Sequence, residues 1–385
     1  MNRLTRHVAG VLVVIGMLAG GTGAASALAA RPDFPGFGPP GLGLRHAVFV
    51  QTDGLSGNQI VAYDRARDGA LTQVGVYSTG GLGGQLTGSV VDHTASQGSL
   101  AYDSADNLLF AVNAGSDTVS VFAVFGDRLA LRQVISSGGA FPVSVTASRG
   151  AVYVLNAEEG GSIQGYAVVF GHLVLLPSSH RSLGLTTGKP GEPEQFTHTP
   201  GQVAFSPDGS HLIVTTKAAG QSIEVFTVYP WGALSRNPVV NSDETVPFGV
   251  SFDPQGHLLV AEAAGALASF QLNQSGTLTA LDSVETNQAA TCWVTSAAGY
   301  YYTSNAGSAT LTGFQATGGG QLTLLGNTAT HPGTVDGASA GDFLYVQGGG
   351  EGTVDELQVR ADGSLEELGS VIVPGAAGGE GIVAT

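Results

Sequence analysis

Short apolar runs separated by turn residues are the dominant pattern along this chain. In the clearest copy, residues 106–129, an apolar run (108–112) leads to an Asn-Ala-Gly-Ser turn, and a β-branched and aromatic run (118–124) leads to Gly126-Asp127. Runs of about four to eight such residues between turn signals are typical of β-strands. The pattern predicts strand, turn, strand, turn, with a further strand opening at Leu129.

The opening of that further strand recurs along the chain. A glycine followed closely by a leucine stands at Gly69/Leu71, Gly126/Leu129, Gly171/Leu173, Gly232/Leu234, Gly276/Leu278, Gly320/Leu322 and Gly363/Leu365. Seven copies indicate seven repeats of one structural unit.

A second set of apolar runs fixes the register of the repeat. These runs are 47–51, 109–113, 152–156, 212–216, 258–262, 301–305 and 343–347. Turns such as Ser206-Pro207-Asp208-Gly209 precede most of them, and a short strand such as 202–205 precedes the turn. Each unit is predicted to hold four antiparallel strands. Such a unit cannot bury both faces alone, so we expect an all-β fold, a seven-bladed β-propeller.

The two ends of the repeat region complement each other. The first unit begins directly on a second-strand pattern near His46, while Glu380–Thr385 has the pattern of a first strand. The C-terminal strand is therefore predicted to close the ring as the innermost strand of blade 1.

Two insertions interrupt the regular spacing, at residues 79–97 and 186–199. Both connect the fourth strand of one blade to the first strand of the next. In a propeller these connections share a face with the turns between strands two and three, which we call the top face. Long insertions confined to one face of a repeat protein usually mark the binding face.

The N-terminal segment has the features of an export signal. Arg3, Arg6 and His7 precede the apolar stretch 8–20, and a small-residue cleavage site follows at Ala27-Leu28-Ala29. We expect residues 1–29 to be a signal peptide cleaved near Ala29, residues 30–45 a Pro/Gly-rich linker, and residues 46–385 the propeller. The mature protein is then secreted, extracellular and not inserted in a membrane.

The net charge expected for the mature chain makes some classes of binding partner unfavourable. Removing Arg3 and Arg6 from the 14 basic residues leaves 12 against 30 acidic ones, a net charge of −18. A field of that sign repels phosphate backbones, so nucleic acid is not an expected partner. We expect a monomer that binds a small-molecule ligand or an extracellular protein.

Neither a cofactor nor a metal ion is expected. The sequence has no His-x-x-x-His pair and no dense Asp/Asn/Gly calcium loop. Cys292 is the single cysteine and lies within a predicted strand, so we expect a small buried apolar group rather than a thiolate nucleophile.

The blade motif resembles a known family. Strand ends such as VYVLN (152–156) and YYTSN (301–305), the Ser-Pro-Asp-Gly turn and the closing strand are similar to those of the seven-bladed lactonase-type propellers with YVTN-like repeats. That family includes propeller-type 6-phosphogluconolactonases and carboxymuconate cyclases. The resemblance implies a propeller fold over residues 46–385 and, as an expectation, lactonase (carboxylic ester hydrolase) activity.

The chain departs from the family where that family binds anions. Family members carry His and Arg near the starts of their inner strands, whereas blade 4 opens here with Gln202 and blade 5 with Pro247-Phe248-Gly249. The mature chain has only two lysines, Lys189 and Lys217. A phosphorylated or dicarboxylate substrate is therefore disfavoured.

One sector of the top face gathers ionisable residues. Five blades carry an amide at the end of the second strand, but blades 4 and 5 place Thr216-Lys217 and Glu262 there. Beside them, His198 ends the second insertion. His198 or Glu262 could activate water and Lys217 could stabilise an oxyanion, so these three are the catalytic candidates. Alternatively, the amides and Thr216 satisfy their own turns, and Lys217 and Glu262 form an exposed ion pair.

Ligand-binding candidates come from the same face. The first insertion supplies Asp92, His93 and Gln97, in a loop expected either to be solvated or to close over a ligand. The remaining candidates are Lys189, Glu194, Gln202 and Phe248.

Two functions remain open from the sequence. The first is an extracellular lactonase-like propeller that binds a neutral small molecule or a surface partner on its top face. The alternative is a hydrolase or isomerase that opens a lactone ring.

Overall fold

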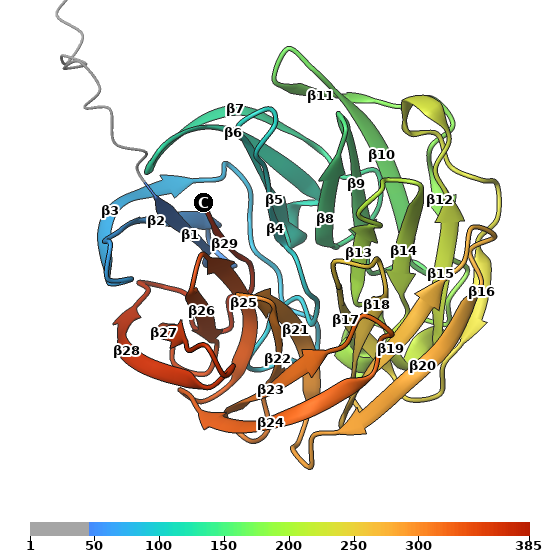
Figure 1. Ribbon diagram of the computed structural model, residues 1–385. Coiled ribbons are helices and arrows are strands. Elements are labelled where there is room, and N and C mark those ends of the chain that lie inside the picture. Colours follow the sequence, from blue (N-terminus) through green and yellow to red (C-terminus); the bar gives the residue numbers. More distant parts are fainter. Residues whose placement is uncertain (1–45) are drawn as a thin grey trace, which may run out of the picture. The chain divides into compact units, whose positions relative to one another are not determined.

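Seven antiparallel sheets surround a common axis (Figure 1). The computed structural model describes residues 46–385. The expected signal peptide and linker lie outside these described residues. Consecutive inner strands contact one another around the whole ring, which confirms the predicted seven-bladed β-propeller.

The blades follow one another in chain order, and we number them from the N-terminus. From the inside outward, blade 1 contains β29 (Ile382–Ala384), β1 (Ala47–Gln51), β2 (Gln59–Arg65) and β3 (Leu71–Ser78); blade 2 β4 (Leu100–Asp103), β5 (Leu108–Asn113), β6 (Thr118–Phe125) and β7 (Arg128–Ser136); blade 3 β8 (Pro142–Ser148), β9 (Ala151–Asn156), β10 (Ser162–Val169), β11 (His172–Leu175) and β12 (Arg181–Ser182). Blade 4 contains β13 (Gln202–Phe205), β14 (His211–Thr215), β15 (Ser222–Thr227) and β16 (Val239–Ser242); blade 5 β17 (Pro247–Phe252), β18 (Leu258–Glu262), β19 (Ala266–Leu272) and β20 (Leu278–Glu285); blade 6 β21 (Thr291–Ala297), β22 (Tyr300–Asn305), β23 (Thr310–Ala316) and β24 (Leu322–Ala329); blade 7 β25 (Thr334–Ala340), β26 (Phe343–Gly348), β27 (Thr353–Val359) and β28 (Leu365–Ile372).

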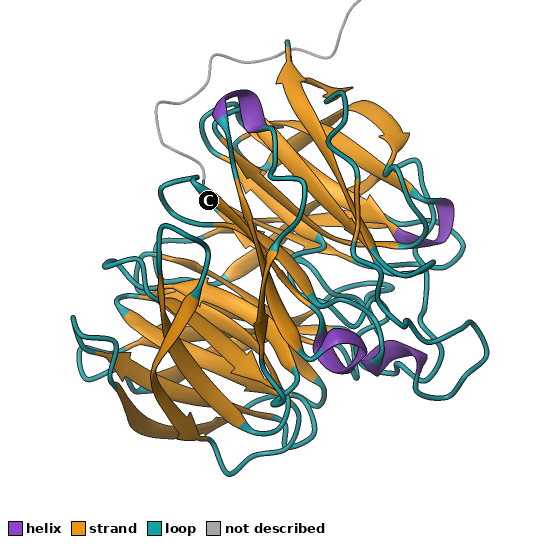
Figure 2. Ribbon diagram, turned by 90° about the vertical axis from the view of Figure 1, so that its right-hand side faces the viewer, coloured by secondary structure: helices purple, strands orange, loops and turns teal. Residues whose placement is uncertain are grey.

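Helical segments are short and lie among the loops, as Figure 2 shows from the side. They are α1 (Lys217–Gly220) and the 3₁₀ turns η1 (Ala114–Ser116), η2 (Gln195–Thr197) and η3 (Pro230–Gly232). Within residues 46–385 no helix has both the length and the apolar character needed to cross a membrane.

The C-terminal strand closes the ring as predicted. β29 pairs antiparallel with β1, with Val50 opposite Ile382 and Phe49 opposite Val383. The amide of Gln51 donates to the carbonyl of Gly381 at 2.8 Å. In Figure 1 the last strand, β29, lies beside β1, so the first and last strands of residues 46–385 share one blade.

Two outer strands depart from the expected pattern. In blade 3 the outer position is divided between β11 and β12, which pair with different parts of β10. In blade 4 the prediction that Leu234 opens the fourth strand is wrong, because Leu234 forms only an isolated bridge with Val228 and β16 begins at Val239. Pro238 directly precedes β16 and has no N–H to donate to a ladder.

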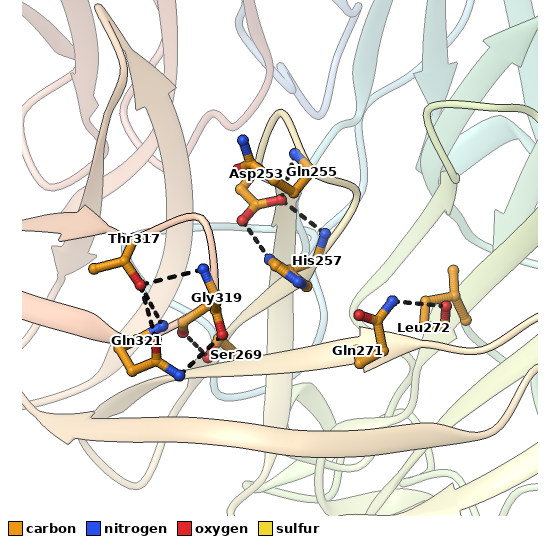
Figure 3. A network of polar contacts seen from close by, with 10 residues as sticks. Asp253, Gln255, His257, Ser269, Gln271, Leu272, Thr317, Gly319 and Gln321 are labelled. Atoms are coloured by element: carbon orange, nitrogen blue, oxygen red, sulfur yellow. Dashed lines mark hydrogen bonds and ion pairs between the residues drawn. The ribbon is translucent and has the colours of Figure 1, made fainter.

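The repeated glycine before the outer strand connects neighbouring blades. Its carbonyl oxygen accepts a hydrogen bond from a side chain of the preceding blade in five cases: Tyr345 to Gly69, Tyr153 to Gly232, Asn241 to Gly276, Ser269 to Gly320 and Tyr302 to Gly363. Figure 3 shows Ser269 beside this turn in blade 6, with the turn held by Thr317 and Gln321. The repeated motif thus docks one blade on the next.

The hydrophobic core lies between adjacent blades. One cluster combines Phe49 and Ile60 of blade 1 with Leu109 and Phe122 of blade 2, all fully buried. Equivalent clusters fill the other blade interfaces. Because every blade shares its core with two neighbours, the ring is stabilised as a whole.

Candidate functional site

The first insertion fills the top of the central channel. Its side chains Leu86, Thr94 and Ser96 are fully buried, and Gln97 is 8% exposed. The expectation of a solvated loop is therefore wrong for residues 92–97. We call residues 86–97 the plug.

Hydrogen bonds attach the plug to inner strands on opposite sides of the channel. Both side-chain ends of Gln97 bond to the backbone of Val294 in blade 6, each at 3.0 Å. Its backbone amide donates to Gly201 before blade 4. The carbonyl of Ser96 accepts from the indole N–H of Trp293 at 2.6 Å, while its hydroxyl donates to Val143 in blade 3.

Bulges in the inner strands adapt the ring to the plug. The register shifts at the start of the innermost strand in blades 3, 5, 6 and 7. Bulges bend a strand and re-aim its side chains. In blade 5 the bulge contains Gly249, where a Cβ atom would lie 2.1 Å from Oε1 of Gln97. Only glycine leaves room for the Gln97 amide at this position.

Four buried carboxyl groups lie in the plug or next to it. Asp92 accepts hydrogen bonds from the backbone amides of Thr94, Ala95 and Ser96, all within the plug. Glu380, just before β29, accepts from the amide of Gly98 at 2.7 Å. The remaining two are Asp53, which accepts from Gln51, and Asp336, which bonds with Glu380.

Burial raises the pKa of all four carboxyl groups. Desolvation brings the pKa of Asp53 to about 7 and those of Asp92 and Asp336 to about 6. For Glu380, burial and the neighbouring carboxylates of Asp336 and Asp92 both raise the pKa. Charge is disfavoured in this cluster because little water reaches it.

Lys217 lies beside the plug and is 1% exposed. Its Nζ donates to the carbonyl of Ala95 in the plug at 2.6 Å and to that of Phe196 in the second insertion at 2.7 Å. It also lies 5.1 Å from the centre of the Phe248 ring. Burial lowers the pKa of Lys217 to about 7, and the nearby charge of Asp92 opposes this shift.

An apolar cluster completes the wall around Lys217. Phe248 packs against Trp293 with ring centres 5.0 Å apart, and Cys292 and Val335 belong to the same cluster. Burial raises the pKa of the Cys292 thiol to about 12. Cys292 is therefore a small buried apolar group, as predicted.

The second insertion forms a separate, open cavity of about 390 Å³ on the top face. Its lining residues are Thr186, Thr187, Gly188, Glu192, Pro193, Glu194 and His198. The two insertions touch, because the amide of Phe196 donates to the carbonyl of Thr87. The prediction that both insertions lie on one face is confirmed.

His198 lies at the wall of this cavity, with Nδ1 oriented by two neighbours. Its Nδ1 lies 2.8 Å from Oγ1 of Thr197 and 3.1 Å from the carbonyl oxygen of Glu194. When the Thr197 hydroxyl donates to that carbonyl, 2.9 Å away, Nδ1 carries the proton of the neutral ring. The other nitrogen, Nε2, is then the proton acceptor of the neutral ring.

The three catalytic candidates do not meet. Lys217 does not line the cavity that contains His198. Glu262 is 4% exposed at the end of β18, where burial and the charge of Asp243 raise its pKa to about 7. Among the described residues no ion pair joins Glu262 to Lys217, so the expected exposed pair between them is wrong. Both side chains are buried in different surroundings.

The alternative interpretation of the turn residues holds for Asn113, Asn305 and Thr216, but not for Gln51, whose Nε2 donates to the carbonyl of Val112 in blade 2. Nδ2 of Asn113 donates to Ser120 at 2.8 Å, and Nδ2 of Asn305 donates to Thr312 at 2.8 Å. Thr216 donates to the carbonyl of Ser222 within its own turn. These polar groups satisfy local backbone and side-chain partners and stabilise the repeat.

The predicted ligand-binding residues divide between the channel and the surface. Gln202 and Phe248 face the channel, where Oε1 of Gln202 accepts from the amide of Val250 at 2.6 Å. His93 is half-buried, and burial lowers its pKa. Lys189 and Glu194 are exposed on the second insertion. Asp92 and Gln97 therefore belong to the plug, and Phe248 lies beside Lys217. Of the predicted ligand-binding residues, only Glu194 lines the cavity together with His198.

Sequence reasoning missed four residues of the channel. Asp53, Trp293, Asp336 and Glu380 come from three different blades and approach one another only after ring closure. Glu380 could have been identified from the sequence, since it is an acidic residue directly before a strand predicted to be innermost and therefore close to the channel. Within residues 46–385 no group of three or more His, Cys, Asp or Glu side chains is arranged to hold a metal ion.

Comparison with known proteins supports the fold. No family model matches the chain, and no curated protein matches it by sequence. A candidate 6-phosphogluconolactonase of Bacteroides fragilis has a solved structure similar to 90% of this chain and 100% of its own, with a TM-score of 0.71 and 17% identity. A counterpart from Bacteroides uniformis gives a TM-score of 0.72 at 17% identity, covering 89% of this chain and all of the other.

A third solved structure is the periplasmic gluconolactonase PpgL of Pseudomonas aeruginosa. Its TM-score is 0.71 at 17% identity, with 88% of this chain and 99% of PpgL covered. At this level of identity the likeness concerns the fold. The chain thus has the seven-bladed propeller fold of these lactonase structures, as the blade motif predicts.

Proposed function

We propose that this protein is a hydrolase that opens neutral lactones in the His198 cavity. The observation that carries the proposal is the position of His198 at the wall of a cavity of about 390 Å³, with Nδ1 within hydrogen-bond distance of the Thr197 hydroxyl and the Glu194 carbonyl. A general base with defined orientation is the minimum requirement for activating water. The fold shared with solved lactonase structures supports the same activity class.

The reaction requires only water as the second reactant. Nε2 of His198 accepts a proton from water while the water oxygen bonds to the lactone carbonyl carbon. The tetrahedral intermediate collapses, the ring C–O bond breaks, and the leaving alkoxide takes the proton from His198. The product is a hydroxy acid, whose ionisation releases one proton to solution.

The acidic side chains that line the cavity favour a neutral lactone over a phosphorylated one. Glu192 and Glu194 line the cavity, and no lysine or arginine does. A phosphate group would be repelled there, whereas a neutral ring would not. In this proposal Lys217 is a positioning residue, because it holds the carbonyl of Phe196 two residues before His198.

Proton release from a panel of uncharged γ- and δ-lactones tests the proposal. The purified protein should release protons faster than buffer, and His198→Ala should abolish the difference. His180→Ala is the matched control, since His180 is exposed directly before β12 and does not line the cavity. Equal rates for His198→Ala and the unaltered protein would reject His198 as the base.

A second candidate function is binding of a neutral small molecule on the top face without chemical conversion. The separation of Lys217 and Glu262 from the His198 cavity favours it, because no buried cation stands ready to stabilise an oxyanion there. A ligand-dependent rise in melting temperature without proton release would support this function over hydrolysis.

We also propose export and a monomeric state. The signal-like N-terminal sequence supports export. A closed ring leaves no strand edge at the junction of first and last blades, which is compatible with a monomer. Fractionation of the source cells and light scattering of the purified protein test these two points.

A further inference from the structure

A second cavity, of about 380 Å³, lies at the opposite strand ends from the insertions. It is formed by the turn between β8 and β9, the turn between β13 and β14, and the segment after β15, so it spans blades 3 and 4. Its volume lies in the range of small-molecule sites, about 300–1,000 Å³. We call it the lower groove.

Trp231 at the edge of the lower groove is 92% exposed, and Tyr229 beside it is 52% exposed. Trp231 also has a φ of 70°, a left-handed conformation that bulky residues rarely adopt. Such backbone outliers cluster at functional sites, where the surrounding structure enforces them. Phe170 is equally exposed at a φ of 50° in the corresponding turn of blade 3, so what distinguishes Trp231 is that it lines a groove.

The turn that carries Trp231 is held rigidly. The hydroxyl of Tyr153 donates to the carbonyl of Gly232 at 2.6 Å, and the amide of Tyr229 donates to Ala233 at 2.7 Å. Arg181 donates to the carbonyls of Leu234 and Ser235. The indole is thus presented to solvent on a fixed support, which lowers the entropic cost of binding.

The groove is lined by one basic and one acidic side chain, Arg149 and Asp208. Asp208 accepts hydrogen bonds from Ser206 and Ser210, which lower its pKa to about 2 and keep the carboxylate ionised. The side chain of Arg149 crosses Gly209, and among residues 46–385 its guanidinium has no hydrogen-bond or ion-pair partner. The groove therefore offers free donors and an ionised acceptor beside aromatic rings.

We propose that the lower groove binds a pyranose sugar of a neutral glycan. The C–H face of a pyranose ring is apolar and stacks on an indole, while its hydroxyls both donate and accept hydrogen bonds. Arg149 donates to hydroxyl oxygens, Asp208 accepts from hydroxyl groups, and Trp231 with Tyr229 supplies the stacking surface. Because the groove presents one positive group, Arg149, and one negative group, Asp208, it suits an uncharged ligand better than an anion or a cation. The site is independent of the His198 cavity.

Tryptophan fluorescence gives a direct assay. The chain has two tryptophans, and the other, Trp293, is 3% exposed inside the channel. Maltohexaose, cellohexaose, laminarihexaose and chitohexaose are titrated into the purified protein up to about 10 mM. At least one should shift the Trp231 emission to shorter wavelength and saturate, with isothermal titration calorimetry giving the same Kd.

Trp231→Gly separates binding from folding. Glycine relieves the left-handed strain, so the melting temperature should stay equal or rise while calorimetric affinity falls about tenfold or more. Phe170→Ala is the matched control, because Phe170 is 97% exposed with a φ of 50° in the corresponding turn of blade 3, outside the groove. Arg149→Ala should weaken binding as well. Absence of saturable binding for all four sugars, or undiminished binding by Trp231→Gly, would overturn the proposal.

Discussion

Nζ of Lys217 lies 2.7 Å from the carbonyl oxygen of Phe196 and donates a hydrogen bond to it. Through its second bond, to Ala95, the same ammonium group joins the two insertions that distinguish this chain from a regular repeat. An apolar residue at position 217 would leave both buried carbonyl groups without this donor.

Lys217→Met should destabilise the protein by about 1–3 kcal/mol, because two buried carbonyl groups lose their donor. The pH dependence gives a sharper test. Burial lowers the Lys217 pKa from 10.5 to about 7, so its contribution to stability is complete above 10.5 and is lost as the pH falls towards 7. Urea unfolding should give the unaltered protein a larger unfolding free energy at pH 9 than at pH 7 from the titration of Lys217. Lys217→Met should lack this increase.

Lys189→Met provides the control, since Lys189 is the other lysine and is exposed. It should leave the pH dependence of the unfolding free energy unchanged. If Lys217→Met shows the same gain between pH 7 and pH 9 as the unaltered protein, the ammonium group is not the source of that gain.

The carboxyl cluster formed by Asp53, Asp92, Asp336 and Glu380 predicts the opposite trend at acidic pH. The pKa values of Asp53, Asp92 and Asp336 rise from 3.8 to about 6 or 7, and that of Glu380 rises as well. A raised folded-state pKa stabilises the fold below the unfolded-state value, and this contribution is lost as the pH rises through the folded-state value. Stability should fall between about pH 4 and pH 7.

Glu380→Gln tests this trend, since the amide retains an acceptor for Gly98 but cannot ionise. The melting temperature of this variant should decrease less between pH 4.5 and pH 7.5 than that of the unaltered protein. Glu351→Gln, at an exposed glutamate, serves as the control. Parallel curves for Glu380→Gln and the unaltered protein would contradict the assignment.

The fold was predictable because its determinants are local and repeated. Each glycine and leucine before an outer strand is visible in the sequence, and so is the unpaired pattern at Glu380–Thr385 that closes the ring. What the sequence did not reveal is the use of the repeated glycine, since Tyr345 and Gly69 are bonded across 276 positions of the chain.

The plug was not predictable for a related reason. Residues 79–97 have the composition of a solvated loop, with many glycines and no periodicity. Their burial depends on polar partners supplied by distant blades, such as Val294, which lies 197 positions after Gln97. Local sequence does not encode such pairing. The composition of the first insertion therefore predicts a loop at the surface, whereas Asp92 and Gln97 are buried in the channel.

Tyr345→Phe tests the blade-docking bond. The Tyr345 hydroxyl is buried and donates to the carbonyl of Gly69 at 2.7 Å, across the junction of blades 7 and 1. Its loss should cost about 1–3 kcal/mol of unfolding free energy, since the carbonyl stays buried without a donor. Tyr77→Phe, in the outer strand of blade 1, is the control and should change stability by less than about 0.5 kcal/mol. Equal effects of the two variants would argue against docking by this bond.

Gly249→Ala should displace the plug. The added Cβ would lie 2.1 Å from Oε1 of Gln97 and 2.8 Å from the carbonyl oxygen of Cys292, so the Gln97 amide must leave its partners on Val294. Hydrogen exchange of residues 86–97 should increase while the strands of blades 1 and 2 stay protected. Gly256→Ala is not a matched control because its φ is 86°, but Gly318→Ala is, with open space around the added Cβ. Unchanged exchange in the plug would show that the bulge accommodates a side chain.

Removal of residues 375–385 tests ring closure and the plug together. The deletion takes away β29, which pairs with β1, and Glu380, which accepts hydrogen bonds from Gly98 and Ser99. The inner edge of β1 would then be unpaired, and the carboxyl cluster would lose its central member. We expect a large fall in melting temperature or loss of the cooperative transition, measured by calorimetry. Thr385→Ala, which keeps β29 but loses the side-chain bond to Ala47, should change the melting temperature little. A truncated protein with its full melting temperature would show that the ring does not depend on its closing strand.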